Sequence, residues 1–177
     1  MSRVYEDDSD ESFPNQWHLQ QHNMKQVLVS QRGRNALADL RTALQALPEP
    51  RLIGRALSTA GKAVPGDALK TATDHDRQEL LGTEGEGVCA VGAYVWWQHV
   101  LAGADPVQAM RDLPLNPDYD GGSWETVNLG KEAGLAATLA WVLLCKNDDT
   151  FKELTPEVRF TSFMAWIEQT LAASVTA

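Results

Sequence analysis

The stretch GLAATLAWVLLCKNDD (residues 134–149), followed by TPEVRFTSFMAWIEQTL (residues 155–171), decides the fold class of this chain. The first part is an apolar run that ends in a polar break, and the second opens with Thr155 before Pro156. A small polar cap followed by proline at the first helical position is typical of a helix N-terminus. The last third of the chain, residues 124–177, therefore predicts two helices joined by a polar, acidic hinge.

An amphipathic stripe supports the second of these helices. Its large apolar residues recur at spacings of three and four and fall on one helix face: Phe160, Phe163, Met164, Ile167 and Leu171. The first helix is expected to be capped by Ser123 and to run on to Asn147. Within it, Gly130 and Gly134 are expected to allow a neighbouring helix to approach closely.

Further helices are expected upstream. A leucine stripe predicts a helix over residues 34–47, which Pro48 ends. Less regular spacing indicates a helix over residues 16–31. Residues 88–102 are apolar nearly all round and favour a buried helix over a strand, and Asp105-Pro106 starts another. Residues 51–57 fit a strand or a helical turn, and residues 58–87 an extended loop with a helical piece at 67–81.

The expected fold is therefore mainly α: one helical domain over residues 16–177, with five to seven helices and a minor β piece as an alternative near residues 51–57. The long segment at 58–87 is an insertion in this domain. A chain of 177 residues, 44% of them apolar, can bury one core. No apolar run is long enough to span a bilayer, and no signal peptide is visible, so we expect a soluble cytoplasmic protein and no membrane partner.

Charge is unevenly placed along the chain, whose net charge is −9. Residues 1–24 carry −4, and we expect the acidic segment 1–15 to be disordered. Residues 25–62 carry +5, and residues 63–177 carry −10. Arg32, Arg34 and Arg41 form the candidate basic patch, which could meet phosphates, the acidic half of a second copy, or acids elsewhere in the fold. The acidic remainder disfavours nonspecific nucleic-acid binding.

The hinge supplies most of the candidate site residues. A paired-carboxylate site for acid/base chemistry would need one partly buried acid; otherwise these side chains serve a helix end and the next helix start. The adjacent Trp96 and Trp97 cannot both face inward, so one is expected at a packing boundary or a partner surface. The interaction candidates are Asn147, Asp148, Asp149, Glu153, Glu157, Trp96 and Trp97.

Metal and nucleophile signals are weak. Asp118 and Asp120 lie in a loop that resembles the first half of a calcium-binding EF-hand, but Val127 stands where the bidentate glutamate belongs. We therefore expect a plain turn there and no metal or other cofactor. Cys89 and Cys145 both lie in apolar runs and are expected to be small buried side chains.

Several pieces of the chain together resemble a group of small uncharacterised proteins from tailed bacteriophages and related prophages. The resemblance covers about half of the chain, and the segment from Ser58 to Glu86 departs from the pattern of that group. It implies a phage-encoded intracellular protein and brings no activity, cofactor or catalytic residue. The pieces are residues 32–34, the leucine stripe with residues 48–53, residues 87–92, residues 147–149, and residues 155–157 with Trp166.

These observations favour a non-enzymatic accessory protein that binds a host or phage macromolecule, most naturally a protein, and acts in host takeover or against host defence. One alternative is a small-molecule or nucleotide-derivative binding or hydrolytic protein that uses Asp148, Asp149 and Glu153. A second is nucleic-acid binding through the basic residues of the 25–55 segment. Association of two copies is also open.

Overall fold

The computed structural model describes residues 17–54, 56–60, 85–114, 122–151 and 154–173. Within these ranges the chain is mainly helical and forms no strand, which confirms the all-α expectation. The helices are α1 (Trp17–Val29), α2 (Gln31–Ala46), α4 (Ala90–Leu101), α5 (Pro106–Asp112), α6 (Gly122–Glu132), α7 (Ala137–Cys145) and α8 (Pro156–Ala173), with a π-helical turn, η2 (Lys146–Thr150), after α7. None of these helices is both long and apolar enough to cross a membrane.

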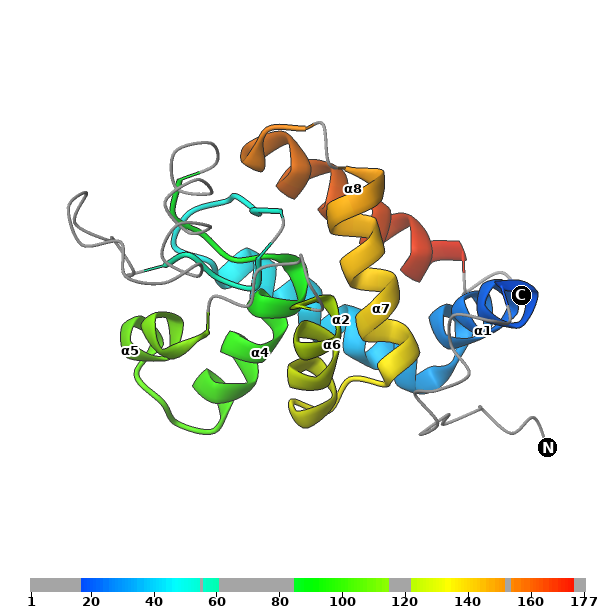
Figure 1. Ribbon diagram of the computed structural model, residues 1–177, viewed down its shortest axis with the longest axis horizontal. Helices are drawn as coiled ribbons and strands as arrows, with labels where there is room; N and C mark the ends of the chain where they lie inside the picture. Colours follow the sequence, from blue (N-terminus) through cyan, green and yellow to red (C-terminus); the bar gives the residue numbers. More distant parts are fainter. Residues whose placement is uncertain (1–16, 55, 61–84, 115–121, 152–153, 174–177) are drawn as a thin grey trace.

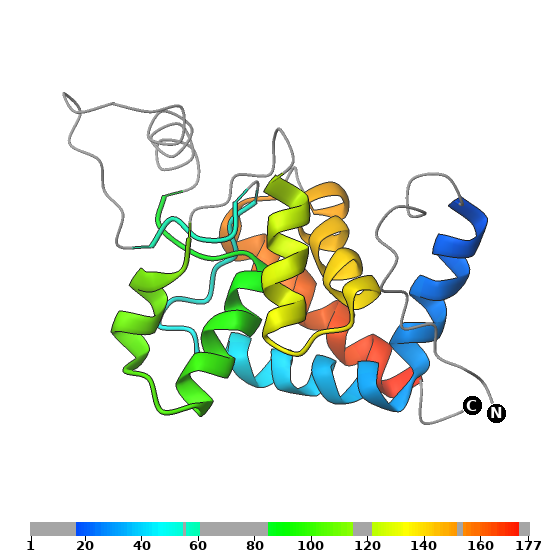
Figure 2. The ribbon, with the colours of Figure 1, turned by 60° about the horizontal axis from the view of Figure 1, so that its bottom comes forward.

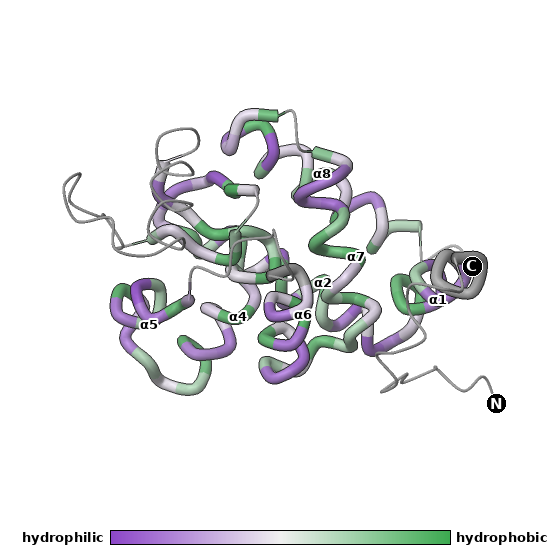
Figure 3. Tube along the Cα trace, viewed as in Figure 1, coloured by the Kyte–Doolittle hydropathy of each residue, from purple (hydrophilic) through white to green (hydrophobic). Residues whose placement is uncertain are grey.

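The helices surround one hydrophobic core. α2 packs on α4 and α8, α6 packs on α4 and α7, and α1 packs on α2 and α7. Figures 1 and 2 place α1 at one end of the molecule and α5 at the other. Figure 3 shows the apolar residues gathered in inner elements such as α7, with more hydrophilic residues along α5. The core extends from Val27 in α1 to Ile167 in α8.

The leucine stripe and the C-terminal stripe both face this core as predicted. Leu37, Leu40 and Leu44 of α2 are buried, and so are Phe163 and Ile167 of α8. Two predicted helix starts are also confirmed. Asp105 accepts a hydrogen bond from the Gln108 backbone N–H at 2.8 Å, and α8 begins at Pro156.

The helix predicted from Ser123 to Asn147 is in fact two helices. α6 ends at Glu132 and α7 starts at Ala137. Gly134 lies between them with φ +102°, a left-handed conformation that breaks a helix and that glycine tolerates. Gly130 does allow close approach, because a Cβ there would stand 3.1 Å from the Cβ of Ala140.

The segment predicted as a strand or helical turn, residues 51–57, forms neither a helix nor a named strand at its described positions, where Leu52, Ile53, Ala56 and Leu57 are buried. We call residues 51–54 and 56–57 the extended segment. It pairs with the chain that enters α4: the Ile53 N–H donates to Val88 O at 3.0 Å, and the Cys89 N–H donates to Leu57 O at 3.0 Å. Ser58 and Val88 form an isolated antiparallel bridge. The two ends of the predicted 58–87 loop therefore lie side by side, while residues 61–84 fall outside the described ranges.

Close packing at the start of α4 predicts a stability cost for Gly92→Ala. A Cβ at this position would stand 2.4 Å from the carbonyl oxygen of Leu57. Alanine favours a helix over glycine by about 1 kcal/mol, yet we expect unfolding free energy to fall by about 1–3 kcal/mol because the backbone must move. Urea unfolding measures this change.

Gly103→Ala provides the comparison, because no atom lies within 4 Å of its added Cβ and only its φ of +95° opposes the change. Its cost is expected to stay near 1 kcal/mol. A Gly92→Ala variant as stable as the wild type would contradict the close approach of α4 to Leu57.

Candidate functional site

The polar break after α7 is a π-helical turn, and its Asn147 side chain is buried. The Asn147 Nδ2 group donates to Ile53 O at 2.8 Å and to the Asp148 Oδ1 atom at 2.6 Å. Asn147 thereby ties the end of α7 to the extended segment at residues 52–57. A fully buried amide cannot meet a partner molecule, so Asn147 is not the surface contact that the sequence suggested.

A buried arginine completes this arrangement. Arg159, in the first turns of α8, is only 1% exposed. Its guanidinium donates to three backbone carbonyls: Leu52 O at 2.9 Å, Leu154 O at 3.1 Å and Phe151 O at 3.3 Å. A buried cation is costly unless its donors are satisfied, and here backbone oxygens from two segments satisfy them.

Asp148 and Arg159 meet at the backbone of Gly54. A Cβ built on Gly54 would stand 3.4 Å from Arg159 Nη2 and 3.4 Å from Asp148 Oδ1. A carboxylate and a guanidinium thus approach the same point of the extended segment. We call Asn147, Asp148 and Arg159 the buried polar cluster; it joins η2 and α8 to residues 52–54.

The sequence analysis did not single out Arg159. The signal was present, since Arg159, Phe163 and Ile167 follow one another at intervals of four, which places them on one helix face. A charged residue in the register of an apolar stripe indicates a buried charge that needs partners.

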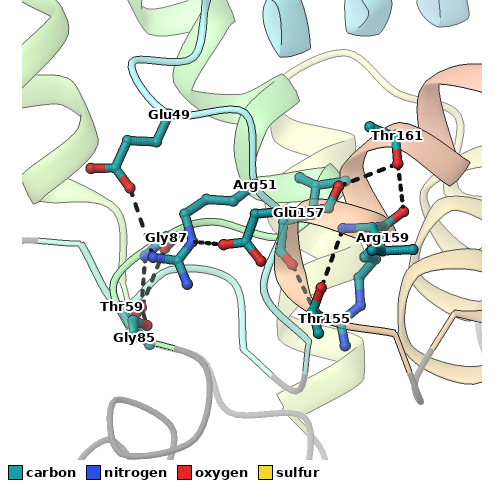
Figure 4. A network of polar contacts seen from close by, with 11 residues as sticks. Glu49, Arg51, Thr59, Gly85, Gly87, Thr155, Glu157, Arg159 and Thr161 are labelled. Carbon is teal, nitrogen blue, oxygen red and sulfur yellow. Dashed lines mark hydrogen bonds and ion pairs between the residues drawn. The ribbon is translucent and has the colours of Figure 1, made fainter.

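Two of the hinge acids, Asp149 and Glu157, are exposed, whereas Asp148 of the buried polar cluster is partly buried. Glu157 lies 3.6 Å from Arg51 Nε, and Glu49 lies 3.7 Å from Arg51 Nη1. Figure 4 shows Arg51 between these two carboxylates. These ion pairs lie at the surface beside the extended segment, and each contributes little to stability.

Two candidate groups lie outside the described residues: Glu153 of the hinge, and Asp118 with Asp120 of the EF-hand-like loop. Over the part of the chain that the structure describes, no group of three or more His, Cys, Asp or Glu side chains could hold a metal ion.

Cys145 lies against the hinge acids. Burial raises the pKa of its thiol to about 12, and the negative charge of Asp149, a hydrogen bond to Asp149 and the charge of Asp148 act in the same direction. The neighbouring Lys146 has a lowered pKa because it is partly buried. Its Nζ lies 5.1 Å from the Phe151 ring centre and 5.5 Å from that of Trp166, a cation–π arrangement.

The paired tryptophans divide as predicted. Trp96 is 2% exposed and donates from Nε1 to Pro106 O at 2.9 Å, so it joins α4 to α5. Trp97 is only partly buried, with its ring centre 6.0 Å from that of Trp96. Trp97 is therefore the residue at the packing boundary.

The three arginines of the basic patch have different surroundings. Arg32 donates to Gly134 O at 3.5 Å, and Arg41 lies 3.5 Å from Glu168 of α8. Arg34 donates to the amide oxygen of Gln31 at 2.7 Å. One member of the patch is thus paired with an acid elsewhere in the fold, and another contacts a backbone carbonyl.

Arg34 also lines a groove of about 690 Å³ between α1, α2 and the C-terminal half of α8. Figure 2 shows the end of α8 approaching the corner where α1 meets α2. We call this hollow the α1–α8 groove; its described lining residues are Lys25, Leu28, Val29, Arg34, Trp166, Gln169, Thr170 and Ala173. The surface it presents is mostly apolar.

The groove escaped the sequence analysis because its walls come from both ends of the chain. One signal was the irregular apolar spacing of the helix at residues 16–31. Val29 breaks that pattern, and in the structure it is 53% exposed. A second, smaller hollow of about 180 Å³ includes Glu49, Arg51, Glu86 and Met110 in its lining.

Comparison with protein-family models, with curated proteins and with solved structures finds no match to this chain. The candidate site therefore rests on the geometry of the chain itself.

The buried polar cluster predicts that Arg159→Met lowers the unfolding free energy by about 3 kcal/mol. Methionine fits the volume but removes the donors that Arg159 gives to Leu154 O, Phe151 O and the buried Leu52 O. Arg159→Lys should also be destabilising, because one ammonium cannot reach carbonyls on both sides. Denaturant unfolding provides the measurement.

Arg41→Lys is the matched control, since the Arg41 side chain is 38% exposed and its pairing with Glu168 is a surface contact. We expect it to change stability by less than about 0.5 kcal/mol. An Arg159→Met variant as stable as the Arg41→Lys variant would contradict the anchoring role of Arg159.

The raised pKa of Cys145 predicts slow alkylation. In a Cys89→Ser background at pH 8, the thiol stays protonated because its pKa lies above the pH. Iodoacetamide should therefore react more than about 100-fold slower than with an unperturbed thiol. Asp149→Asn should accelerate the reaction, because it removes a negative charge and a hydrogen bond that help to raise the pKa of the thiol. Asp112→Asn on α5 serves as the control, and an equal acceleration there would contradict the assignment to Asp149.

Proposed function

We propose that this chain is a non-enzymatic interaction protein of phage type, which binds a host or phage protein through the α1–α8 groove. The observation that carries the proposal is the groove itself: an open, mainly apolar hollow with two cations, Lys25 and Arg34, in its described lining. Apolar surface left open to water is costly, and on folded proteins it commonly marks a binding surface.

The shape of the groove also fits peptide or helix recognition. Helices α1 and α8 supply its apolar residues, and a groove between helices is a common receptor for an amphipathic segment that inserts a few bulky side chains. Val29, Leu28 and Trp166 offer such contacts. Tryptophan is among the residues most enriched at the energetic centre of interfaces.

The alternative that uses the hinge acids has weaker support. Asn147 is buried against Ile53 O, and Asp148 approaches Arg159 at Gly54. These groups serve internal contacts, and the described linings of the two hollows include none of the hinge acids. Nucleic-acid binding is weakened by the pairing of Arg41 with Glu168 and by the net charge of −9.

The test places a photo-crosslinking residue at Val29 and, as a control, at Val107 of α5, which is 61% exposed. In host-cell lysate we expect a protein adduct from position 29 that untagged wild-type chain competes away, and none from position 107. Adducts of equal yield at both positions, or none at position 29, would contradict the proposal.

A thermal-shift screen with divalent metals and nucleotides tests the competing function. A ligand present at 100 times its Kd stabilises the folded state by about 2.7 kcal/mol. A large shift of the melting temperature with any of these small molecules would favour a small-molecule binder instead.

A further inference from the structure

The charges at the rim of the α1–α8 groove indicate what kind of partner it takes. Lys25 and Arg34 are its two ionisable described lining residues, and no acidic residue lines it among those described. This basic rim belongs to a chain whose net charge is −9. A local field of opposite sign to the whole molecule selects for a partner with acidic groups at that point.

Arg34 can accept such a partner. Its guanidinium has five N–H donors, and it donates to the amide oxygen of the neutral Gln31 side chain at 2.7 Å. By contrast, the Arg41 guanidinium lies 3.5 Å from the Glu168 carboxylate. Within the described ranges no carboxylate forms an ion pair with Lys25 or Arg34. Both cations are thus available to a carboxylate from another molecule.

The apolar wall on the α8 side is held in place. The Trp166 ring packs edge-on against Phe163 with centres 5.3 Å apart, and Lys146 lies over it at 5.5 Å. Phe163 is fully buried. A side chain fixed on its inner face loses little freedom when a partner covers its outer face, and such preorganisation favours binding.

The opposite wall is fixed by the α1–α2 corner. Ser30 Oγ donates to Val27 O at 2.8 Å and accepts from the Gly33 N–H at 3.0 Å. A Cβ on Gly33 would stand 1.8 Å from Val27 O, so the two helices meet backbone to backbone. This corner sets the direction of α1 and keeps Leu28 and Val29 on the groove.

We propose that the α1–α8 groove binds an acidic segment of a partner protein, whose bulky apolar side chain packs against Val29 and Trp166 while its carboxylates meet Lys25 and Arg34. This inference rests on the proposed function and adds to it the chemistry of the partner. Neither an acidic segment alone nor an apolar segment alone would contact both the cationic and the apolar lining residues of the groove.

The experiment selects binders from a random peptide library displayed on phage, with the full chain immobilised as bait. We expect the selected peptides to share Asp or Glu together with Leu, Phe or Trp. Fluorescence anisotropy then measures each peptide with the wild type, with Lys25→Glu/Arg34→Glu, and with Val29→Ser. Each variant should weaken binding about tenfold or more, and raising NaCl from about 50 to 500 mM should weaken it as well.

Arg111→Glu is the matched control, because it reverses one exposed cation on α5, far from the groove, and it should leave binding unchanged within about twofold. Circular dichroism of each variant shows that the fold persists. Selected peptides without an acidic excess, no selected peptide at all, or equal binding by the charge-reversed variant would overturn the proposal.

Two further arms identify other occupants. The first arm uses a synthetic peptide of residues 3–15, which is itself acidic. If this peptide binds the wild type as tightly as the selected peptides do, and does not bind Lys25→Glu/Arg34→Glu, then the occupant is the chain's own N-terminal segment and the partner-protein proposal is overturned. Self-association in sedimentation that this variant abolishes would instead assign the groove to a second copy.

The outcomes also separate this inference from the proposed function. A protein adduct at position 29 combined with neutral or basic selected peptides overturns the acidic chemistry alone. Acidic peptides that bind the groove without any adduct from lysate overturn the proposed function and leave the chemistry of the groove in place.

Discussion

The structure depends on one buried cation, the guanidinium of Arg159. It donates to Leu52 O on one side and to Phe151 O and Leu154 O on the other, so it joins an extended segment to the turn before α8. A segment that pairs with its neighbour at isolated points and belongs to no sheet leaves backbone carbonyls to be satisfied by other donors. Arg159 and Asn147 supply donors to Leu52 O and Ile53 O from outside the segment, which lets these two residues lie buried.

The same anchor positions α8 for its role at the groove. Trp166 lies two helical turns after Arg159 on the chain, and Glu168 pairs with Arg41 of α2. The start of α8 is thus held by buried hydrogen bonds and its later turns by packing on Phe163 and α2. An internal polar cluster at one end of α8 therefore determines where an apolar wall stands at the other end. The hinge and the groove are thus linked through α8, although their residues have separate roles.

Local patterns in the sequence were sufficient for most helices. The spacing of Leu37, Leu40 and Leu44 and the caps at Asp105 and Thr155 are local signals, because a helix is determined by neighbours three and four residues away. The break at Gly134 was missed for the same reason: the apolar run continues across it, and only the left-handed backbone reveals the turn. The site needed information from distant residues. Lys25 and Trp166 lie 141 positions apart, and no local spacing pattern can predict that both line the same groove.

Electrostatics distinguishes the acidic hinge from the groove that we propose as the binding surface. In the hinge, opposite charges are already close together: Asp148 approaches Arg159, and Glu157 lies near Arg51. Charges that already face an opposite charge within the fold contribute little binding free energy to a partner molecule. At the groove, Lys25 and Arg34 stand beside apolar surface with no acid in the described lining. A carboxylate of a bound partner would meet two cations that form no ion pair within the described residues. The apolar surface beside these cations would strengthen the attraction by excluding water.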